Sequence, residues 1–144
     1  MTVPGRNEFP LRGEAEMRAR TQLTPDTSSP RAARRFVAQA LVDWNGKEAR
    51  DDAVLLVDEL VTNAVRHART PLEVTLEIGQ AEVRVEVTDA SPLIPQPRDR
   101  EAADDSGRGL HIVAALADAW GVRPEPEGKA VWFRLAADRT RVEG

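Results

Sequence analysis

The spacing of apolar residues changes along the chain, and each spacing predicts a different element. From residue 29 to residue 68 apolar side chains recur every three or four positions, which is typical of amphipathic helices. Asn45-Gly46 interrupts this repeat, so we expect two helices. A serine pair before Pro30 marks the start of the first. The second runs from about Lys47 to Ala68, and Thr70-Pro71 prevents it from continuing.

Alternation of apolar and polar residues then replaces the helical spacing. Residues 74–78 and 83–87 are apolar at every second position, and the short Gly79-Gln80 link between them predicts a β-hairpin. A last alternating run at 131–135 follows a glycine turn and predicts a further strand. Residues 17–23 alternate less regularly, and we interpret them as an edge strand.

Between the hairpin and the last strand lie a polar loop and a short apolar helix. Residues 92–106 are rich in Pro, Asp and Arg and have no apolar face, so we interpret them as a functional lid or a disordered segment. Gly107-Arg108-Gly109 opens a helix expected from Leu110 to Ala119, and Trp120-Gly121 closes it. The tryptophans at the helix ends, Trp44 and Trp120, are assigned to packing.

Together these elements predict an α+β fold, a two-layer α/β sandwich with a mixed or antiparallel sheet and helices on one face. A chain of 144 residues is long enough for a single domain with a sizeable core. We expect that domain to span residues 16–138, between a disordered tail at 1–15 and a second tail at 139–144.

Composition excludes several classes of site and partner. The chain has 20 Lys and Arg against 24 Asp and Glu, so its net charge does not favour the binding of nucleic acid. The absence of cysteine excludes disulfides and thiolate zinc sites, and 2 histidines are too few for most histidine metal sites. Neither a secretory signal nor a membrane-length apolar run is present, so we expect a cytoplasmic protein without membrane contact.

The second helix carries a polar ridge opposite its apolar stripe. At helical spacing Glu59, Asn63 and Arg66 fall on one side, below Asp52 and Leu56. A carboxylate, an amide oxygen and a cation placed together can polarise a hydroxyl, ligate Mg²⁺ and meet phosphate charge. A solvated polar face produces the same pattern and, for the ridge alone, is the simpler interpretation.

Two further features can bind a nucleotide but also have ordinary structural explanations. Asp89 ends the second hairpin strand and can accept a hydrogen bond from an exocyclic amine, although aspartate at such a position often only begins a turn. Gly107-Arg108-Gly109 at a helix start offers free N–H groups and a positive dipole end to phosphate, or simply forms a turn.

The order of these features resembles the ATP-binding (Bergerat) fold of gyrase, heat-shock chaperones, mismatch-repair ATPases and histidine kinases. That order is a Glu-x-x-x-Asn helix, a hairpin ending in Asp, a loop, Gly-x-Gly opening a helix, and a strand after a glycine turn. The strings 58–68 and 106–110 look like the anti-sigma factor serine/threonine kinases, especially the short actinobacterial ATP-binding regulators. The resemblance covers Arg31 to Leu135 and includes Trp120-Gly121 and the string 128–133.

On the second helix, the resemblance implies a role for each residue of the ridge. Glu59 matches the family's general base, and Asn63 matches its Mg²⁺ ligand, through which the metal bridges the ATP phosphates. Arg66 and His67 lie just beyond Asn63, where related proteins place basic groups near phosphate. For His67, a cation that caps the helix end is an equally good interpretation.

The remaining site residues come from the segments after the hairpin. By resemblance, Asp89 is the carboxylate that reads the adenine amino group, and Ser91 belongs to the same wall of the pocket. The segment Gly107-Arg108-Gly109-Leu110 matches the glycine-rich turn around the phosphates, with Arg108 near the terminal phosphate.

The implied cofactors are ATP and Mg²⁺, and the implied function is that of an anti-sigma-type regulator. Such a protein captures a sigma factor and phosphorylates a serine or threonine of an anti-sigma factor antagonist. The resemblance also allows a homodimer. The alternative function is a non-catalytic binding module that regulates through protein contacts, with weak or no nucleotide binding.

Two positions depart from the family's pattern. Ala90-Ser91-Pro92 follows Asp89 where relatives have glycines, which reduces backbone freedom at the pocket wall. Ala130 stands where relatives tend to have a threonine near the adenine, so a hydroxyl worth about 0.5–1.5 kcal/mol is missing. We therefore expect weak nucleotide affinity.

Overall fold

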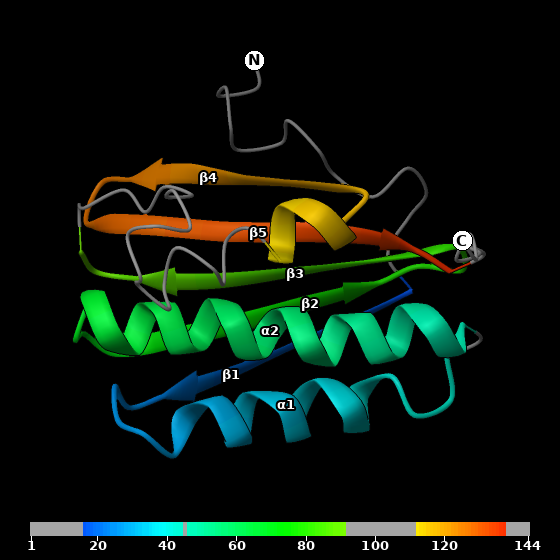
Figure 1. The fold of residues 1–144 in the computed structure, drawn as a ribbon, viewed down its shortest axis with the longest axis horizontal. Helices are drawn as coiled ribbons and strands as arrows, with labels where there is room; N and C mark the ends of the chain where they lie inside the picture. Colours follow the sequence, from blue (N-terminus) through cyan, green and yellow to red (C-terminus); the bar gives the residue numbers. More distant parts are fainter. Residues whose placement is uncertain (1–15, 45, 92–111, 138–144) are drawn as a thin grey trace.

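The computed structural model describes residues 16–44, 46–91 and 112–137 and arranges them in two layers (Figure 1). One layer is a five-stranded sheet, and the other contains two long helices. In chain order the elements are β1 (Met17–Leu23), α1 (Ser29–Ala40), α2 (Lys47–His67), β2 (Leu72–Ile78), β3 (Glu82–Asp89), β4 (Ala119–Glu125) and β5 (Gly128–Ala136). A short helical segment at 112–116 precedes β4.

Neighbouring strands of the sheet are all antiparallel, in the order β1-β2-β3-β5-β4. Helices α1 and α2 and the segment 112–116 lie on one face of this sheet, as Figure 1 shows. The α+β class is thus confirmed, and of the two sheet types expected the sheet is the antiparallel one. The predicted edge strand is β1, and the predicted hairpin is formed by β2 and β3.

The strand β4, which the sequence pattern does not predict, corrects the end of the last helix. Helical geometry stops at residue 116 rather than at Ala119, and Ala119–Glu125 pairs with β5. Gly121 therefore lies inside a strand instead of closing a helix. A Cβ atom at this position would lie 2.9 Å from the Trp132 ring, so the glycine makes room for that ring. An apolar run this short presents too little periodicity to fix a helix end.

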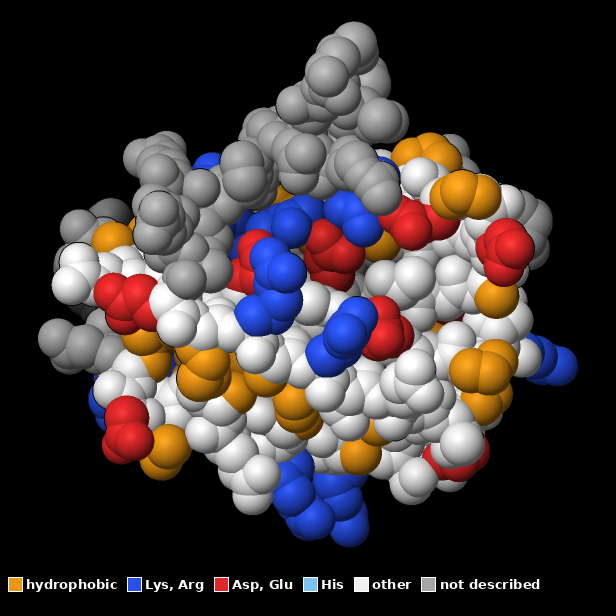
Figure 2. Space-filling model, turned by 180° about the vertical axis from the view of Figure 1, so that it is seen from behind, with side chains coloured by type: hydrophobic (Ala, Val, Ile, Leu, Met, Phe, Trp, Pro, Cys, Tyr) orange, Lys and Arg blue, Asp and Glu red, His pale blue; other side chains and the backbone are white. Residues whose placement is uncertain are grey.

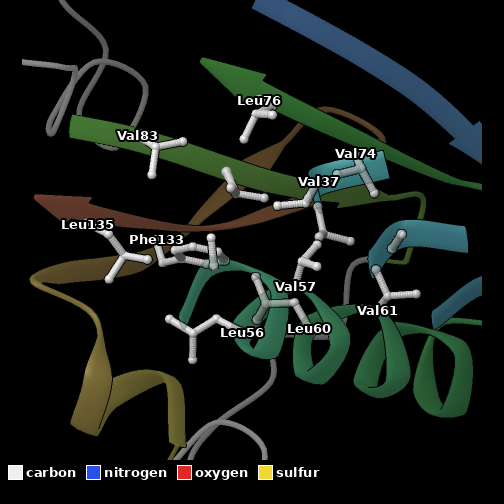
Figure 3. Packing of buried hydrophobic residues seen from close by; sticks show 14 of the residues in the cluster. Val37, Leu56, Val57, Leu60, Val61, Val74, Leu76, Val83, Phe133 and Leu135 are labelled. Carbon is white, nitrogen blue, oxygen red and sulfur yellow. The ribbon is translucent and has the colours of Figure 1, made fainter. Parts of the chain in front are cut away.

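Apolar side chains from both layers meet in a shared core (Figure 3). Its labelled members are Val37 on α1; Leu56, Val57, Leu60 and Val61 on α2; and Val74, Leu76, Val83, Phe133 and Leu135 on the strands. Each buried side chain of this kind contributes about 1.5–3 kcal/mol relative to exposure, so α2 is held firmly against the sheet. The helices are amphipathic, and none that the structure describes is long and apolar enough to cross a membrane.

Two tryptophans pack against this core, as expected. The side chain of Trp44 is buried after α1, and its Nε1 donates a hydrogen bond of 2.8 Å to the carbonyl oxygen of Gly79. Trp120 is half-buried against the core, although it reaches the core from β4 and not from a helix end.

Candidate functional site

The polar ridge of α2 is more buried than its sequence pattern suggests. Asn63 is only 7% exposed, and Asp52 and Leu56 on the same side of the helix are fully buried. Glu59 is half-buried, and Arg66 lies at the exposed end of the helix. The solvated-face interpretation is therefore wrong for Asn63.

The Asn63 side chain has no hydrogen bond partner among the residues that the structure describes. Burying an amide costs free energy unless it is paired, so amides with so little exposure usually have a partner. The carboxamide oxygen of Asn63 is thus available to a metal ion or a bound molecule. Helix α2 supplies the position, because its apolar stripe fixes the rotation of the helix on the sheet.

At the end of β3, Asp89 forms a turn and also remains a buried carboxylate. Its Oδ1 accepts a hydrogen bond of 2.8 Å from the backbone N–H of Ser91. Asp89 and Ser91 are 5% and 8% exposed. The turn interpretation and the binding interpretation are therefore compatible, since the turn uses one carboxylate oxygen and leaves the other.

Lys129 of β5 is a member of this site that the sequence analysis missed. Its Nζ lies 3.0 Å from Asp89 Oδ1 and donates a second hydrogen bond of 3.3 Å to the carbonyl oxygen of Ser91. The side chains of Lys129 and Asp89 are 6% and 2% exposed, so the two charges neutralise each other in the interior. Lys129 extends the inward-facing alternation of the last strand, and a lysine in that register was the signal available in the sequence.

Gly128 allows β5 to approach β3 at this point. Its φ is +155°, and a Cβ atom there would lie 1.9 Å from the carbonyl oxygen of Asp89. Any other residue would therefore force the two strands apart. The turn glycine of the sequence pattern is thus also the residue that places Lys129 beside Asp89.

The strand register also corrects the expectation for Ala130. Asp89 pairs with Lys129, whereas Ala130 pairs with Thr88 on β3 and with Arg123 on β4. Successive residues of a strand point to opposite faces, so Ala130 lies on the face away from the helices. The side chain that β5 presents beside Asp89 is that of Lys129, and the missing hydroxyl at Ala130 is not a loss to the site.

The end of α2 and the end of β3 lie at the same end of the molecule (Figure 1). A hydrogen bond of 2.9 Å from the N–H of Ala90 to Thr70 Oγ1 joins the two segments. The ridge residue Asn63 and the carboxylate of Asp89 therefore belong to one end of the helix–sheet sandwich. Arg66 and His67 are exposed in the last turn of α2 at this end.

The predicted phosphate turn, Gly107-Arg108-Gly109-Leu110, lies outside the described residues, as do Pro92 and the loop that follows it to residue 106. Among the residues that are described, no three His, Asp or Glu side chains are grouped to hold a metal ion. A divalent cation here would rely on the amide oxygen of Asn63 and on oxygens from phosphate and water. This donor set suits Mg²⁺, which keeps several waters and binds through few protein oxygens.

Charged side chains brace the opposite face of the sheet, where Figure 2 shows acidic and basic groups gathered. Arg123 of β4 reaches across β5 to Glu86 of β3 with two hydrogen bonds of 2.9 Å, and Arg84 lies 2.8 Å from the same carboxylate. Burial raises the pKa of Glu86, but the hydrogen bonds and positive charges of Arg123 and Arg84 outweigh it and hold that pKa below its usual range. This network ties the three strands together behind Asp89 and Lys129.

Comparison with known proteins identifies the family of this chain. Residues 23–135 match the model of the histidine kinase-like ATPase domain. The chain is 36% identical over 78 residues to SCO4941, an uncharacterized protein of Streptomyces coelicolor. This aligned region covers 51% of the present chain and 74% of the Streptomyces protein.

One solved structure shares the fold of this chain at low sequence identity. The RsbU and RsbW domains of Rv1364c from Mycobacterium tuberculosis superpose with a TM-score of 0.61 at 18% identity, covering 88% of this chain and 35% of that one. The Acinetobacter baumannii histidine kinase AdeS gives a TM-score of 0.48 at 13% identity, covering 84% and 68%. Because the family model matches residues 23–135, which is most of this chain, the chain belongs to the histidine kinase-like ATPase domain family.

Proposed function

We propose that the protein binds Mg-ATP between the end of α2 and the end of β3 and acts as an anti-sigma-type regulator. The observation that carries this proposal is the pair of buried polar groups at one end of the sandwich. Asp89 offers a carboxylate oxygen to the base, and Asn63 offers to the metal an amide oxygen that has no partner among the described residues. Membership in an ATPase domain family supports the same ligand.

In this proposal each element contributes one part of the nucleotide site. Asp89 and Ser91 would hold the adenine, and Asn63 would supply an oxygen ligand to Mg²⁺. The segment Gly107-Arg108-Gly109-Leu110 surrounds the phosphates, with Arg66 and His67 as further basic groups. The bound Mg²⁺ would offset charge on the phosphoryl group being transferred.

The proposed reaction is phosphoryl transfer to a serine or threonine of an antagonist protein. Glu59 lies one helical turn before Asn63. From this position the carboxylate of Glu59 can accept the proton of an incoming hydroxyl. The oxygen of that hydroxyl attacks the terminal phosphorus of ATP, and ADP leaves. The resemblance of the strings 58–68 and 106–110 to anti-sigma factor kinases supports a sigma factor and its antagonist as partners. We place the protein in the cytoplasm, and a homodimer is compatible with this function.

Titration calorimetry with millimolar Mg-ATP tests the binding step directly. The wild type is expected to release or take up heat, and Asp89→Asn is expected to bind more weakly because it replaces an acceptor by an amide. Asp43→Asn, in the exposed turn after α1, is the matched control and should bind as the wild type does. Absence of heat from the wild type and from both variants would remove the nucleotide proposal.

A non-catalytic binding module is the second candidate function. It is favoured by one observation: Lys129 and Ser91 already occupy part of the acceptor capacity of Asp89. Labelled ATP incubated with the protein and with a small antagonist encoded by a neighbouring gene separates the two functions. Transfer of label to the antagonist supports the kinase, whereas nucleotide binding without transfer supports the binding module.

A further inference from the structure

We infer that Lys129 is the positioning residue that gives the base pocket its selectivity for a 6-amino over a 6-oxo purine. It does so by fixing the Asp89 carboxylate through Oδ1, so that, among the contacts of the described residues, Oδ2 is left for the base. This inference rests on the proposed function, because it concerns the same pocket. Lys129 itself acts through Asp89 and not by contact with the base.

The hydrogen bonds to Asp89 are distributed unequally over its two oxygens. Both the Ser91 N–H, at 2.8 Å, and the Lys129 ammonium, at 3.0 Å, donate to Oδ1. No donor from the described residues contacts Oδ2. A carboxylate held in this way has a fixed orientation, and its remaining acceptor is Oδ2.

The lysine is itself held in place, which makes it suitable for this task. Its second hydrogen bond goes to the carbonyl oxygen of Ser91, so the ammonium bridges both ends of the Asp89 turn. The cross-strand pair between Asp89 and Lys129 fixes its backbone, and Gly128 brings that backbone close. On the other side the bond between Ala90 and Thr70 holds the turn against the segment after α2.

Stability alone gives a poor account of this buried ion pair. Removing two charges from water costs about as much as their attraction returns, and apolar replacements of buried pairs are often as stable. The Lys129–Asp89 pair is almost completely buried at the place where the proposed function puts the base. A role in selecting the ligand explains why both charges stand there.

The chemistry of the two purine types explains the selectivity. A 6-amino group donates a hydrogen bond to a carboxylate oxygen. A 6-oxo group instead places its own acceptor oxygen opposite the carboxylate oxygen, so neither oxygen has a donor. With the ammonium removed, the carboxyl group loses its fixed orientation and its compensating charge. It can then rotate away from the position that suits a 6-amino group, so the discrimination should fall.

Calorimetric titration of the full chain with Mg-ATP and with Mg-inosine triphosphate tests the inference. The wild type should prefer ATP by about tenfold or more, the equivalent of one hydrogen bond to a charged group. Lys129→Met should reduce that ratio to near one. The chain's other lysine, Lys47, is exposed on α2, so Lys47→Met is the matched control and should keep the wild-type ratio.

Three results distinguish the inference from the function on which it rests. Wild type that binds neither nucleotide overturns both. Wild type that prefers ATP while Lys129→Met keeps the same ratio overturns only the role of Lys129, even if the affinity of that variant is lower. If thermal unfolding shows that Lys129→Met is not folded, Lys129→Gln replaces it, and its ratio is expected to fall at least about threefold. An unchanged ratio in Lys129→Gln would then count against the inference.

Discussion

The hydroxyl oxygen of Thr70 accepts a hydrogen bond of 2.9 Å from the backbone N–H of Ala90. Thr70 follows the end of α2, and Ala90 follows Asp89, so this bond connects the helix layer to the carboxylate that we assign to the base. Relatives are expected to have glycine near this point. Here a tether from the neighbouring segment fixes a turn that has less freedom of its own.

Thr70→Val should therefore weaken nucleotide binding more than it weakens the fold. Valine has the shape of threonine but can neither accept from Ala90 nor make the longer 3.2 Å hydrogen bond that the hydroxyl donates to the carbonyl oxygen of Pro71. The bond from Ala90 is the one that reaches the Asp89 turn, and the loss of such a bond is worth about 1 kcal/mol. We expect Mg-ATP affinity to fall about fivefold in calorimetry, which corresponds to that free energy. Thr75→Val in β2, where the described structure shows no side-chain hydrogen bond, is the control and should bind normally.

Glu59→Gln should separate nucleotide binding from phosphoryl transfer. Glutamine keeps the shape of the side chain but is no longer a base, so Mg-ATP affinity should change little. Transfer of labelled phosphate to a cognate antagonist should fall by about 10² or more. Glu48→Gln, in the first turn of the same helix, provides the control. Undiminished transfer in the Glu59 variant would remove this residue from the chemistry.

Asn63→Ala should abolish the Mg²⁺ dependence of nucleotide binding. The amide is 7% exposed and has no partner among the described residues, so its removal takes away the proposed ligand without breaking a hydrogen bond. A small loss of stability, about 1 kcal/mol, is expected from the truncation of a buried side chain. Calorimetry with and without Mg²⁺ checks the first expectation, and thermal unfolding without nucleotide checks the second. A large loss of stability with Mg²⁺ dependence intact would make Asn63 a structural residue.

Glu86→Gln should change the acid stability of the sheet. The pKa of Glu86 is lowered on folding, so its carboxylate stabilises the protein above the unfolded value of 4.5, and that contribution is lost as pH falls through the lower folded value. At neutral pH the variant should lose about 1–3 kcal/mol, because Arg123 and Arg84 lose a charged partner. Its stability should then fall less steeply than that of the wild type under acid.

Urea unfolding across this pH range measures both effects. Glu73→Gln on the same face is the control, since the one charged contact of Glu73 within the described part of the chain is a long one of 4.0 Å with the exposed Arg20. Exposed pairs of that kind contribute about 0–1 kcal/mol. Equal pH profiles for the wild type and Glu86→Gln would show that the carboxylate of Glu86 is not linked to folding.

The fold was predictable where hydrophobic periodicity is long or strictly alternating. Helix α2 and the hairpin of β2 and β3 follow the pattern closely, because each buries one face against the core. Strand β4 was not predictable in this way. All but one of its residues are half-buried at the sheet edge, and it contains Gly121 and Pro124, which are rare in strand interiors.

The candidate site was predictable only in part for a different reason. Glu59 and Asn63 share a helix face that any sequence reading reveals, and Asp89 stands at a clear strand end. Lys129 is 40 residues from Asp89 along the chain, and only strand register brings them together. The burial of Asn63 was equally unpredictable from the sequence. Periodicity describes the residue pattern of one helix and does not say which other segments pack against its polar face.

The positions of the tryptophans decide what optical measurements on this protein can report. With 3 tryptophans and no tyrosine, the emission comes from tryptophan alone. Trp44 is bonded to Gly79 at one end of the sheet, while Asp89 ends the 8-residue strand β3, on the order of 25 Å away. Trp132 lies on the face away from the helices, with the Arg84 guanidinium 5.2 Å from its ring. Intrinsic fluorescence is thus suited to following the unfolding of the sheet and poorly suited to detecting a ligand in the pocket. Detection of the ligand requires a fluorescent label near the end of β3.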